Sequence, residues 1–335
     1  MTDWGDLSSR ARGLSRRLLT PTQLDDLAGA QSITQLSERL NAHGLRVTST
    51  ATTAAELDRA IRRDAAAQLA VLSRWAGAKR RSRLAVVFEE ETVRSLRALV
   101  RGALEGTPAE VRLAGLVATP DLPERALQTL AEQSAPGSIA SLLTAWRHPY
   151  GPPLLRLTRR GRPGRGALEA VLLSTYLQQA ETGSEKEPAD LEHFVRRTRQ
   201  LLEAEAALIA HGAGEAEHDR VPASLRDTAF ARILRAARDR PERLEADLLA
   251  ARIAETSRWA LERPLGLAPI LAYSLKLRAQ LLALGELSWG IALGAPGGLL
   301  RAAGGTPTTA AVGAAATRAP AVATGPATAA AAGNQ

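Results

Sequence analysis

The sequence predicts an all-α protein, and three observations support that prediction. Alanine, leucine, arginine and glutamate dominate the 335 residues, and all four lose little side-chain freedom in a helix. Aromatic residues make up only 3% of the chain, and runs of β-branched residues are few. Apolar residues recur at the helical spacings of three and four, most clearly over residues 190–210.

A repeated unit organises these helices. Each copy opens at a proline turn, and the turns recur after 99 and then 102 residues, at Thr20-Pro21, Thr119-Pro120 and Val221-Pro222. A helix then begins near a Leu-Glu or Glu-Leu pair, namely Glu56-Leu57, Leu168-Glu169 and Leu244-Glu245. A basic amphipathic helix closes each copy. Such repeats build a solenoid or a ring-like scaffold, because each unit buries its apolar face against its neighbours. The alternative is a helical protein of biased composition that resembles itself by chance.

The first copy contains four expected helices, over residues 9–19, 24–40, 51–76 and 89–106. The spacing of Thr53 and Glu56 is that of a capping box, which marks the start of the third helix. Residues 84–88 are the one short run that could be extended. The helix over 89–106 is acidic at its start and basic toward its end, and it is the first closing helix.

The second and third copies close with helices expected over residues 190–210 and 268–293, and loops are expected over 151–166 and 183–188. Residues 302–335 contain almost only Ala, Gly, Thr and Pro, so this segment cannot bury enough surface to offset its ordering entropy and is expected to be disordered. The sequence therefore predicts three helical domains and a tail, with boundaries at 1–115, 116–215, 216–302 and 303–335.

Composition limits the classes of function. The net charge is +8, which favours acidic partners such as nucleic acid, anionic lipid or an acidic protein face. The absence of cysteine excludes disulfides and thiolate chemistry and fits a reducing compartment. The longest apolar stretch, over 281–295, is shorter than the roughly 20 residues that cross a bilayer, and the polar, basic start over 1–17 is not a secretory signal.

No motif for catalysis is present. The chain has no glycine-rich phosphate loop, no Gly-x-Ser-x-Gly elbow and no His-Glu-x-x-His zinc helix, so we expect no catalytic residue, no cofactor and no enzyme activity. One metal-like cluster stands in a polar, glycine-interrupted stretch and is better read as a solvated loop: His211, Glu215, Glu217, His218 and Asp219.

The basic tract over residues 156–165 is the sharpest local feature. It contains Arg160-Gly161-Arg162-Pro163, which is similar to the core of an AT-hook that lies in the DNA minor groove. A single tetrapeptide in an arginine-rich chain is weak support for DNA binding. A loop that meets an acidic protein face, or a solvated loop, is the favoured interpretation.

The closing helices share a more specific pattern. The first, over 90–106, begins with an acidic residue and carries Arg97, Arg101 and Gly102. The second begins at Asp190 and has His193 at its fourth position. The third follows Pro264-Leu265-Gly266 and contains Arg278, and the chain opens with an arginine-rich helix that ends in Leu18-Leu19.

These helices resemble the signature helix of the C subunit of rotary V/A-type ATPases, called the d subunit in eukaryotic vacuolar pumps. In that family the helix reads as an acidic residue, an Asn-Leu pair, a Leu-Arg pair and a basic-Gly ending, and it recurs in three related domains. The first helix matches with Arg97, Arg101 and Gly102 in register, the second has His193 where Asn is usual, and the third lacks the Glu-x-x-Asn. The resemblance covers about residues 5–302.

The resemblance implies a three-lobed, all-helical funnel with pseudo-threefold symmetry. It implies a non-catalytic central-stalk socket that couples the rotor shaft of the soluble sector to the membrane rotor ring for proton or sodium transport, peripheral on the cytoplasmic face of the membrane. No nucleic acid is expected as a partner; the alternative is a basic helical repeat protein associated with nucleic acid. The candidate partner-binding residues are Arg97, Arg101, Arg159, Arg160, Arg162 and Arg278.

Overall fold

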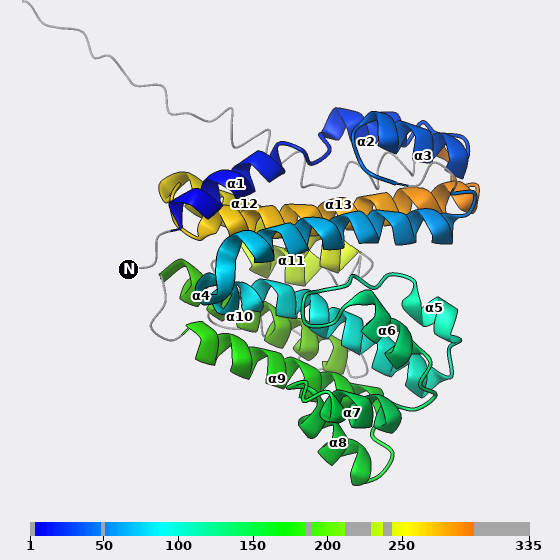
Figure 1. Cartoon of the computed structure of the whole chain (residues 1–335), viewed down its shortest axis with the longest axis vertical. Coiled ribbons are helices and arrows are strands. Elements are labelled where there is room, and N and C mark those ends of the chain that lie inside the picture. Colours follow the sequence, from blue (N-terminus) through cyan, green and yellow to red (C-terminus); the bar gives the residue numbers. More distant parts are fainter. Residues whose placement is uncertain (1–3, 48–50, 185–188, 212–228, 237–242, 298–335) are drawn as a thin grey trace, which may run out of the picture.

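The computed structural model describes residues 4–47, 51–184, 189–211, 229–236 and 243–297. All regular structure in these ranges is helical, which confirms the all-α prediction. The helix α13 (Ala268–Ala292) runs through the middle of the molecule, with α1 to α3 on one side of it (Figure 1). The expected tail over 303–335 and the turn at Val221-Pro222 lie outside the described residues.

The first three helices are short, and their ends follow from local sequence. Helix α1 (Gly5–Ser15) is followed by α2 (Pro21–Leu27), which begins with a capping box between Thr20 and Gln23. Helix α3 (Ile33–Ala42) is capped by Ser32, whose hydroxyl accepts from the Gln35 N–H at 3.2 Å. This cap divides the single helix expected over residues 24–40 into two, so that prediction was wrong.

Helix α4 (Ala54–Glu105) contains both of the longer helices expected in the first copy. The predicted capping box of Thr53 and Glu56 is confirmed at its start. The two halves meet at Gly77, whose φ of 66° and ψ of 175° are not helical. Helix α4 ends at Gly106, which adopts the left-handed conformation with φ 71°.

The extended run expected over residues 84–88 was wrong, because these residues lie inside α4. Val86, Val87 and Phe88 are buried. The second half of α4 packs against α9 on one side and α13 on another. A helix covered on several sides is apolar around much of its surface, so the run of apolar residues reflects burial rather than a strand.

Helix α5 (Ala109–Leu113) lies at the end of the first predicted domain. The second copy contributes five helices: α6 (Glu124–Ala131), α7 (Pro136–Ala145), α8 (Gly151–Arg159), α9 (Arg165–Ser184) and α10 (Ala189–His211). Helix α8 replaces most of the loop expected over residues 151–166, which corrects that prediction. Its prolines, Pro152 and Pro153, occupy the first helical turn, where a missing N–H removes no hydrogen bond. Helix α6 begins at Glu124, four residues after the expected turn at Pro120.

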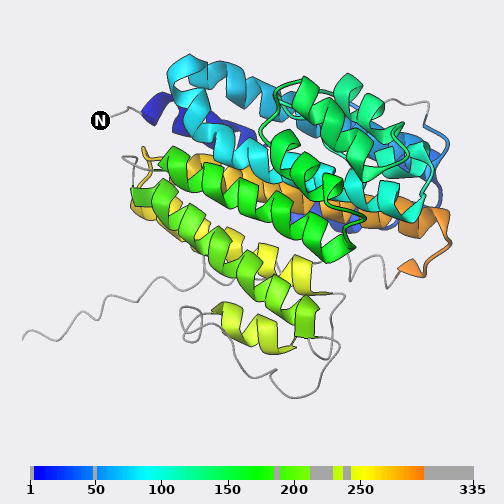
Figure 2. The same cartoon turned by 90° about the horizontal axis from the view of Figure 1, so that it is seen from below.

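The third copy contributes α11 (Ala229–Ala236), α12 (Leu244–Glu262) and the central helix α13. Helices α12 and α13 pack along each other, and α13 also contacts α1, α3 and α4. One continuous apolar core links residues from Trp4 to Leu287. A smaller cluster joins α11 to α12 and the middle of α10, at the lower edge of Figure 2.

Two pairs of short helices lie at a constant spacing along the chain. Helices α2 and α6 begin 103 residues apart, and α3 and α7 both begin and end 103 residues apart. Both α3 and α7 end in a Schellman motif, with Gly44 at φ 88° and Arg147 at φ 56° in the left-handed position. The pseudo-threefold arrangement and the domain boundaries remain predictions.

Candidate functional site

Two of the predicted partner-binding arginines, Arg97 and Arg101, contact a carboxylate of the same chain. Both extend from α4 to Glu169 of α9, at 2.8 and 2.7 Å, and Arg165 donates to the same carboxylate at 3.0 Å. Burial alone would raise the pKa of Glu169, but the three guanidinium hydrogen bonds outweigh burial and lower it to about 2. These arginines therefore join α4 to α9.

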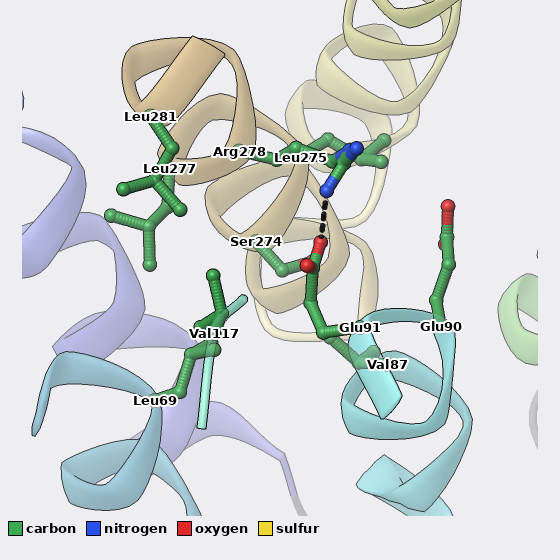
Figure 3. A pocket seen from close by; sticks show the side chains of 10 residues that line it. All are labelled: Leu69, Val87, Glu90, Glu91, Val117, Ser274, Leu275, Leu277, Arg278 and Leu281. Carbon is green, nitrogen blue, oxygen red and sulfur yellow. Dashed lines mark hydrogen bonds and ion pairs between the residues drawn. The ribbon is translucent and has the colours of Figure 1, made fainter. Parts of the chain in front are cut away.

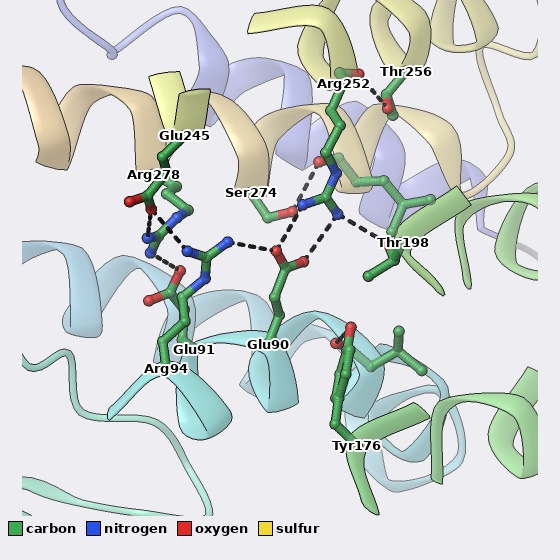
Figure 4. A network of polar contacts seen from close by, with 12 residues as sticks. Glu90, Glu91, Arg94, Tyr176, Thr198, Glu245, Arg252, Thr256, Ser274 and Arg278 are labelled. Atoms are coloured by element: carbon green, nitrogen blue, oxygen red, sulfur yellow. Dashed lines mark hydrogen bonds and ion pairs between the residues drawn. The ribbon is translucent and has the colours of Figure 1, made fainter. Parts of the chain in front are cut away.

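A third predicted arginine, Arg278, belongs to a chain of charges between helices. It donates from α13 to Glu91 of α4 at 2.7 Å and to Glu245 of α12 at 2.8 Å. Arg94 also donates to Glu245, at 3.0 Å, and to Glu90 at 2.9 Å. Figure 4 shows these side chains alternating in sign between α4, α12 and α13.

The chain of charges ends at Arg252 of α12, which was not singled out from the sequence. Its guanidinium donates to both oxygens of Glu90, at 2.7 and 3.1 Å, and to the Thr198 hydroxyl of α10 at 3.0 Å. Burial would raise the pKa of Glu90, but Arg252 and Arg94 hold it well below its usual range. We call this group the ionic chain; its members are Glu90, Glu91, Arg94, Glu245, Arg252 and Arg278.

The ionic chain joins α4 of the first predicted domain to α12 and α13 of the third, and the hydrogen bond from Arg252 to Thr198 extends it to α10 of the second. Its three carboxylates and three guanidiniums balance in formal charge, and most of them are largely buried. The exception is Glu245, whose side chain is 60% exposed. The sequence does contain a sign that Arg252 is buried. Arg252 and Thr256 are polar residues in the stripe of α12 that otherwise consists of apolar residues such as Leu248 and Ile253.

A small pocket lies beside the ionic chain, between α4 and α13. Its cavity volume is about 20 Å³, enough for about one water molecule. Figure 3 shows Glu91 and Arg278 joined at its polar side, with leucine and valine side chains on the other. The pocket is too small for an organic ligand.

The acidic residue that begins the second closing helix also pairs with an arginine. Asp190, at the beginning of α10, is buried and lies 2.5 Å from Arg263 in the turn between α12 and α13. His193 stands edge-on against Trp259 of α12, with ring centroids 4.2 Å apart. Burial lowers the pKa of His193, so the neutral ring is favoured in this contact. Position 193 thus helps to pack α10 against α12.

A separate polar cluster holds the base of α8. The Tyr150 hydroxyl donates to Glu89 of α4 at 2.7 Å, and the Gln179 amide nitrogen of α9, when turned toward Glu89, donates at 3.0 Å. Burial raises the pKa of Glu89, and the negative charge of Asp121 adds to the effect. Among the described residues no arginine or lysine pairs with Glu89, which distinguishes it from Glu90 and Glu91.

The remaining predicted arginines lie at the corner between α8 and α9. Arg159, Arg160 and Arg162 are all exposed, and within the ranges described above they form no ion pair. The six predicted residues are therefore not one surface. Three lie in contacts between helices, and three remain available at an exposed corner.

Two further findings concern metals and membranes. No described part of the chain brings together three or more side chains that could bind a metal ion, and of the sequence cluster only His211 falls within the described ranges. Across the described helices, none is both long enough and apolar enough to span a membrane.

Comparison with known proteins identifies the family. The profile of the ATP synthase (C/AC39) subunit family matches residues 7–210, which is more than half of the chain. A search of the curated proteins found no match. The match gives no support to the nucleic-acid alternative, and it includes the first two closing helices with Glu90, Arg97, Arg101 and Asp190. The chain belongs to the ATP synthase C/AC39 subunit family, the C subunits of V/A-type ATPases.

Proposed function

We propose that the protein is a non-catalytic central-stalk subunit of a V/A-type rotary ATPase. In this role it is a socket that couples the rotor shaft of the soluble sector to the membrane rotor ring, peripheral on the cytoplasmic face of the membrane. The observation that carries the proposal is the family match over residues 7–210.

The packing of the helices suits a part that transmits torque. A coupling subunit must hold its shape under load, and this chain joins α4, α10, α12 and α13 through the ionic chain as well as through a continuous apolar core. Buried ion pairs favour one arrangement of helices over others, because an arrangement that separates the partners leaves a buried charge unpaired. We therefore interpret the ionic chain as structural support for the socket.

The proposal is tested by deletion of the gene and sedimentation of membranes. In cells that lack the chain, the soluble ATPase sector is expected to remain in the supernatant, while the membrane sector sediments. Re-expression of the full chain should restore co-sedimentation and ATP-driven ion pumping. Intact coupling in the deletion strain would contradict the proposed function.

A further inference from the structure

The corner between α8 and α9 carries three positive charges for which the described part of the chain provides no counter-charge. Helix α8 ends at Arg159, Arg160 caps it, Gly161 turns the chain with φ 145°, and α9 begins three residues after Arg162. We call Arg159, Arg160 and Arg162 the arginine corner. Arg165, on the next turn, is also exposed at 54% but pairs with Glu169.

Helix electrostatics account for only part of this arrangement. A cation in the last turn of a helix is favoured by the helix dipole, which explains Arg159 at the end of α8. Arg160 and Arg162 lie beyond the last helical residue, where this effect falls away quickly. The helix dipole therefore gives no reason for the presence of Arg160 and Arg162 at this corner.

Exposed apolar side chains lie around the end of α4, which meets the first turn of α9. Leu104 is 40% exposed and lies one turn beyond Arg101, on the side of α4 that faces α9. Its neighbour Glu105 approaches Arg165 to 3.9 Å, which places this end of α4 next to the corner. Val111 of α5 is 59% exposed, and α5 packs on the same end of α4, where the Arg112 side chain lies close to Gly102.

Exposed acids lie on the same end of the molecule. Glu105 ends α4 and Glu110 lies in the first turn of α5, and both are exposed. These carboxylates weaken the attraction of this end for a phosphate polyanion or an anionic lipid surface. A protein face with its own mixture of charges and apolar side chains would not, because its acidic groups can meet the arginines while its basic groups meet the two glutamates.

We propose that this end of the molecule, formed by the arginine corner with Leu104 and Val111, docks a predominantly acidic face of a partner protein. The inference rests on the proposed function, which supplies that partner as a protein of the soluble ATPase sector. Arginine suits the contact because its planar guanidinium binds carboxylates through two parallel hydrogen bonds. Leucine and valine add apolar area that is covered when the partner binds.

The test measures association of the full chain with immobilised soluble sector prepared from the deletion strain. The variant Arg159→Glu, Arg160→Glu, Arg162→Glu should associate at least about tenfold more slowly than the wild type at low salt, because rim charges act mainly on the association rate. Wild-type association should slow as salt rises, whereas the variant should show a weaker or opposite salt dependence. Leu104→Ser should mainly accelerate dissociation.

A matched control distinguishes an effect of the arginine corner from an effect of the change in net charge. Arg46→Glu, Arg59→Glu, Arg74→Glu makes the same change of charge at exposed positions of the 43–47 segment and the first half of α4. Its association rate should stay within about twofold of wild type. Equal slowing by both triple variants, or none by the corner variant, would overturn the inference while leaving the proposed function standing.

Two further binding experiments test whether the corner binds nucleic acid or lipid instead. Wild-type protein should bind an AT-rich duplex and anionic vesicles only weakly at physiological salt, with no preference for the duplex sequence. Tight binding to either, lost in the corner variant, would assign the corner to a polyanion or to lipid and overturn the inference. If wild-type protein fails to bind the soluble sector at all, both the inference and the proposed function are wrong.

Discussion

At the scale of single residues, we expect the replacement of Arg252 to lower stability strongly. It donates three hydrogen bonds, to Glu90 and Thr198, and its side chain is only 10% exposed. Arg252→Met should lower the free energy of unfolding by about 3 kcal/mol, because it leaves a buried carboxylate with one partner fewer. Arg258→Met, at an exposed position of the same helix, should be nearly neutral. The midpoint of urea denaturation measures both, and equal effects would show that Arg252 acts only through its apolar stem.

Glu89 makes stability depend on pH in an unusual direction. Its pKa in the folded chain is raised from 4.5 by burial and by Asp121. Below pH 4.5 the carboxyl is protonated in the folded and unfolded chains alike. As pH rises, the unfolded chain loses the proton first, so the folded state is progressively destabilised until the pH passes the raised folded value.

The variant Glu89→Gln cannot lose a proton and keeps an acceptor for Tyr150. Its stability relative to wild type should therefore increase as the pH rises above about 4.5, until the pH passes the raised folded pKa of Glu89. The measurement is the difference between the unfolding midpoints of the two proteins at each pH. The other carboxylates are common to both proteins, so their contributions cancel in this difference. A difference that stays constant over this range would show that the Glu89 pKa is not raised.

At the scale of secondary-structure elements, Gly77 decides the shape of α4. Its φ of 66° with ψ of 175° is a conformation that residues with a Cβ rarely adopt. Gly77→Ala should cost about 1 to 3 kcal/mol of unfolding free energy, although nothing lies within 4 Å of the added Cβ.

Gly13→Ala gives the matched control for the same chemical change. Gly13 lies within α1, has no left-handed φ and also has open space around its Cβ position. This substitution should stabilise the protein by about 0.5 to 1 kcal/mol, since alanine has less freedom to lose on folding. Thermal unfolding of the two variants should move in opposite directions; a shift of both to higher temperature would contradict the role of Gly77.

The sequence predicted those features of the helices that depend on interactions between residues close together in the chain. The sequence predicted both the capping box at Thr53 and Glu56 and the apolar stripe of α10, because each depends on residues a few positions apart. The run 84–88 was misread because burial of α4 against α9 and α13 depends on distant residues. The ionic chain was missed for the same reason, since Arg252 and Glu90 are separated by 162 positions.

At the scale of the whole molecule, the described core ends near the end of α13. Leu287 is its last fully buried leucine, and Ala295 packs against the same core. Removal of residues 303–335 should therefore leave the melting temperature and membrane assembly nearly unchanged, because that composition offers almost no charge or large apolar side chain for specific contacts. A fall of several degrees would show that the segment stabilises the folded protein.

The family could be inferred from the sequence because its motif combines residues that bind within the chain. Glu90, Arg97 and Arg101 are restricted by contacts with α9 and α12, so their spacing carries information. Within the described ranges the arginine corner forms no ion pair, so only the structure, which brings Glu105 at the end of α4 to within 3.9 Å of Arg165, gave information on its surroundings.

The central position of α13 constrains the order in which the protein can fold. This helix is made late in synthesis, yet it supplies the surface on which α1, α3 and the first half of α4 pack. At roughly 5 to 20 residues per second, the ribosome needs about 13 to 50 seconds to synthesise the chain from the end of α3 to the end of α13. The apolar faces of the first helices stay uncovered for that time. During that interval the nascent chain exposes leucine-rich surface that only its own C-terminal part can cover. Production of this subunit should therefore depend on chaperones that bind nascent chains, and premature termination before α13 should yield aggregates rather than a shorter folded protein.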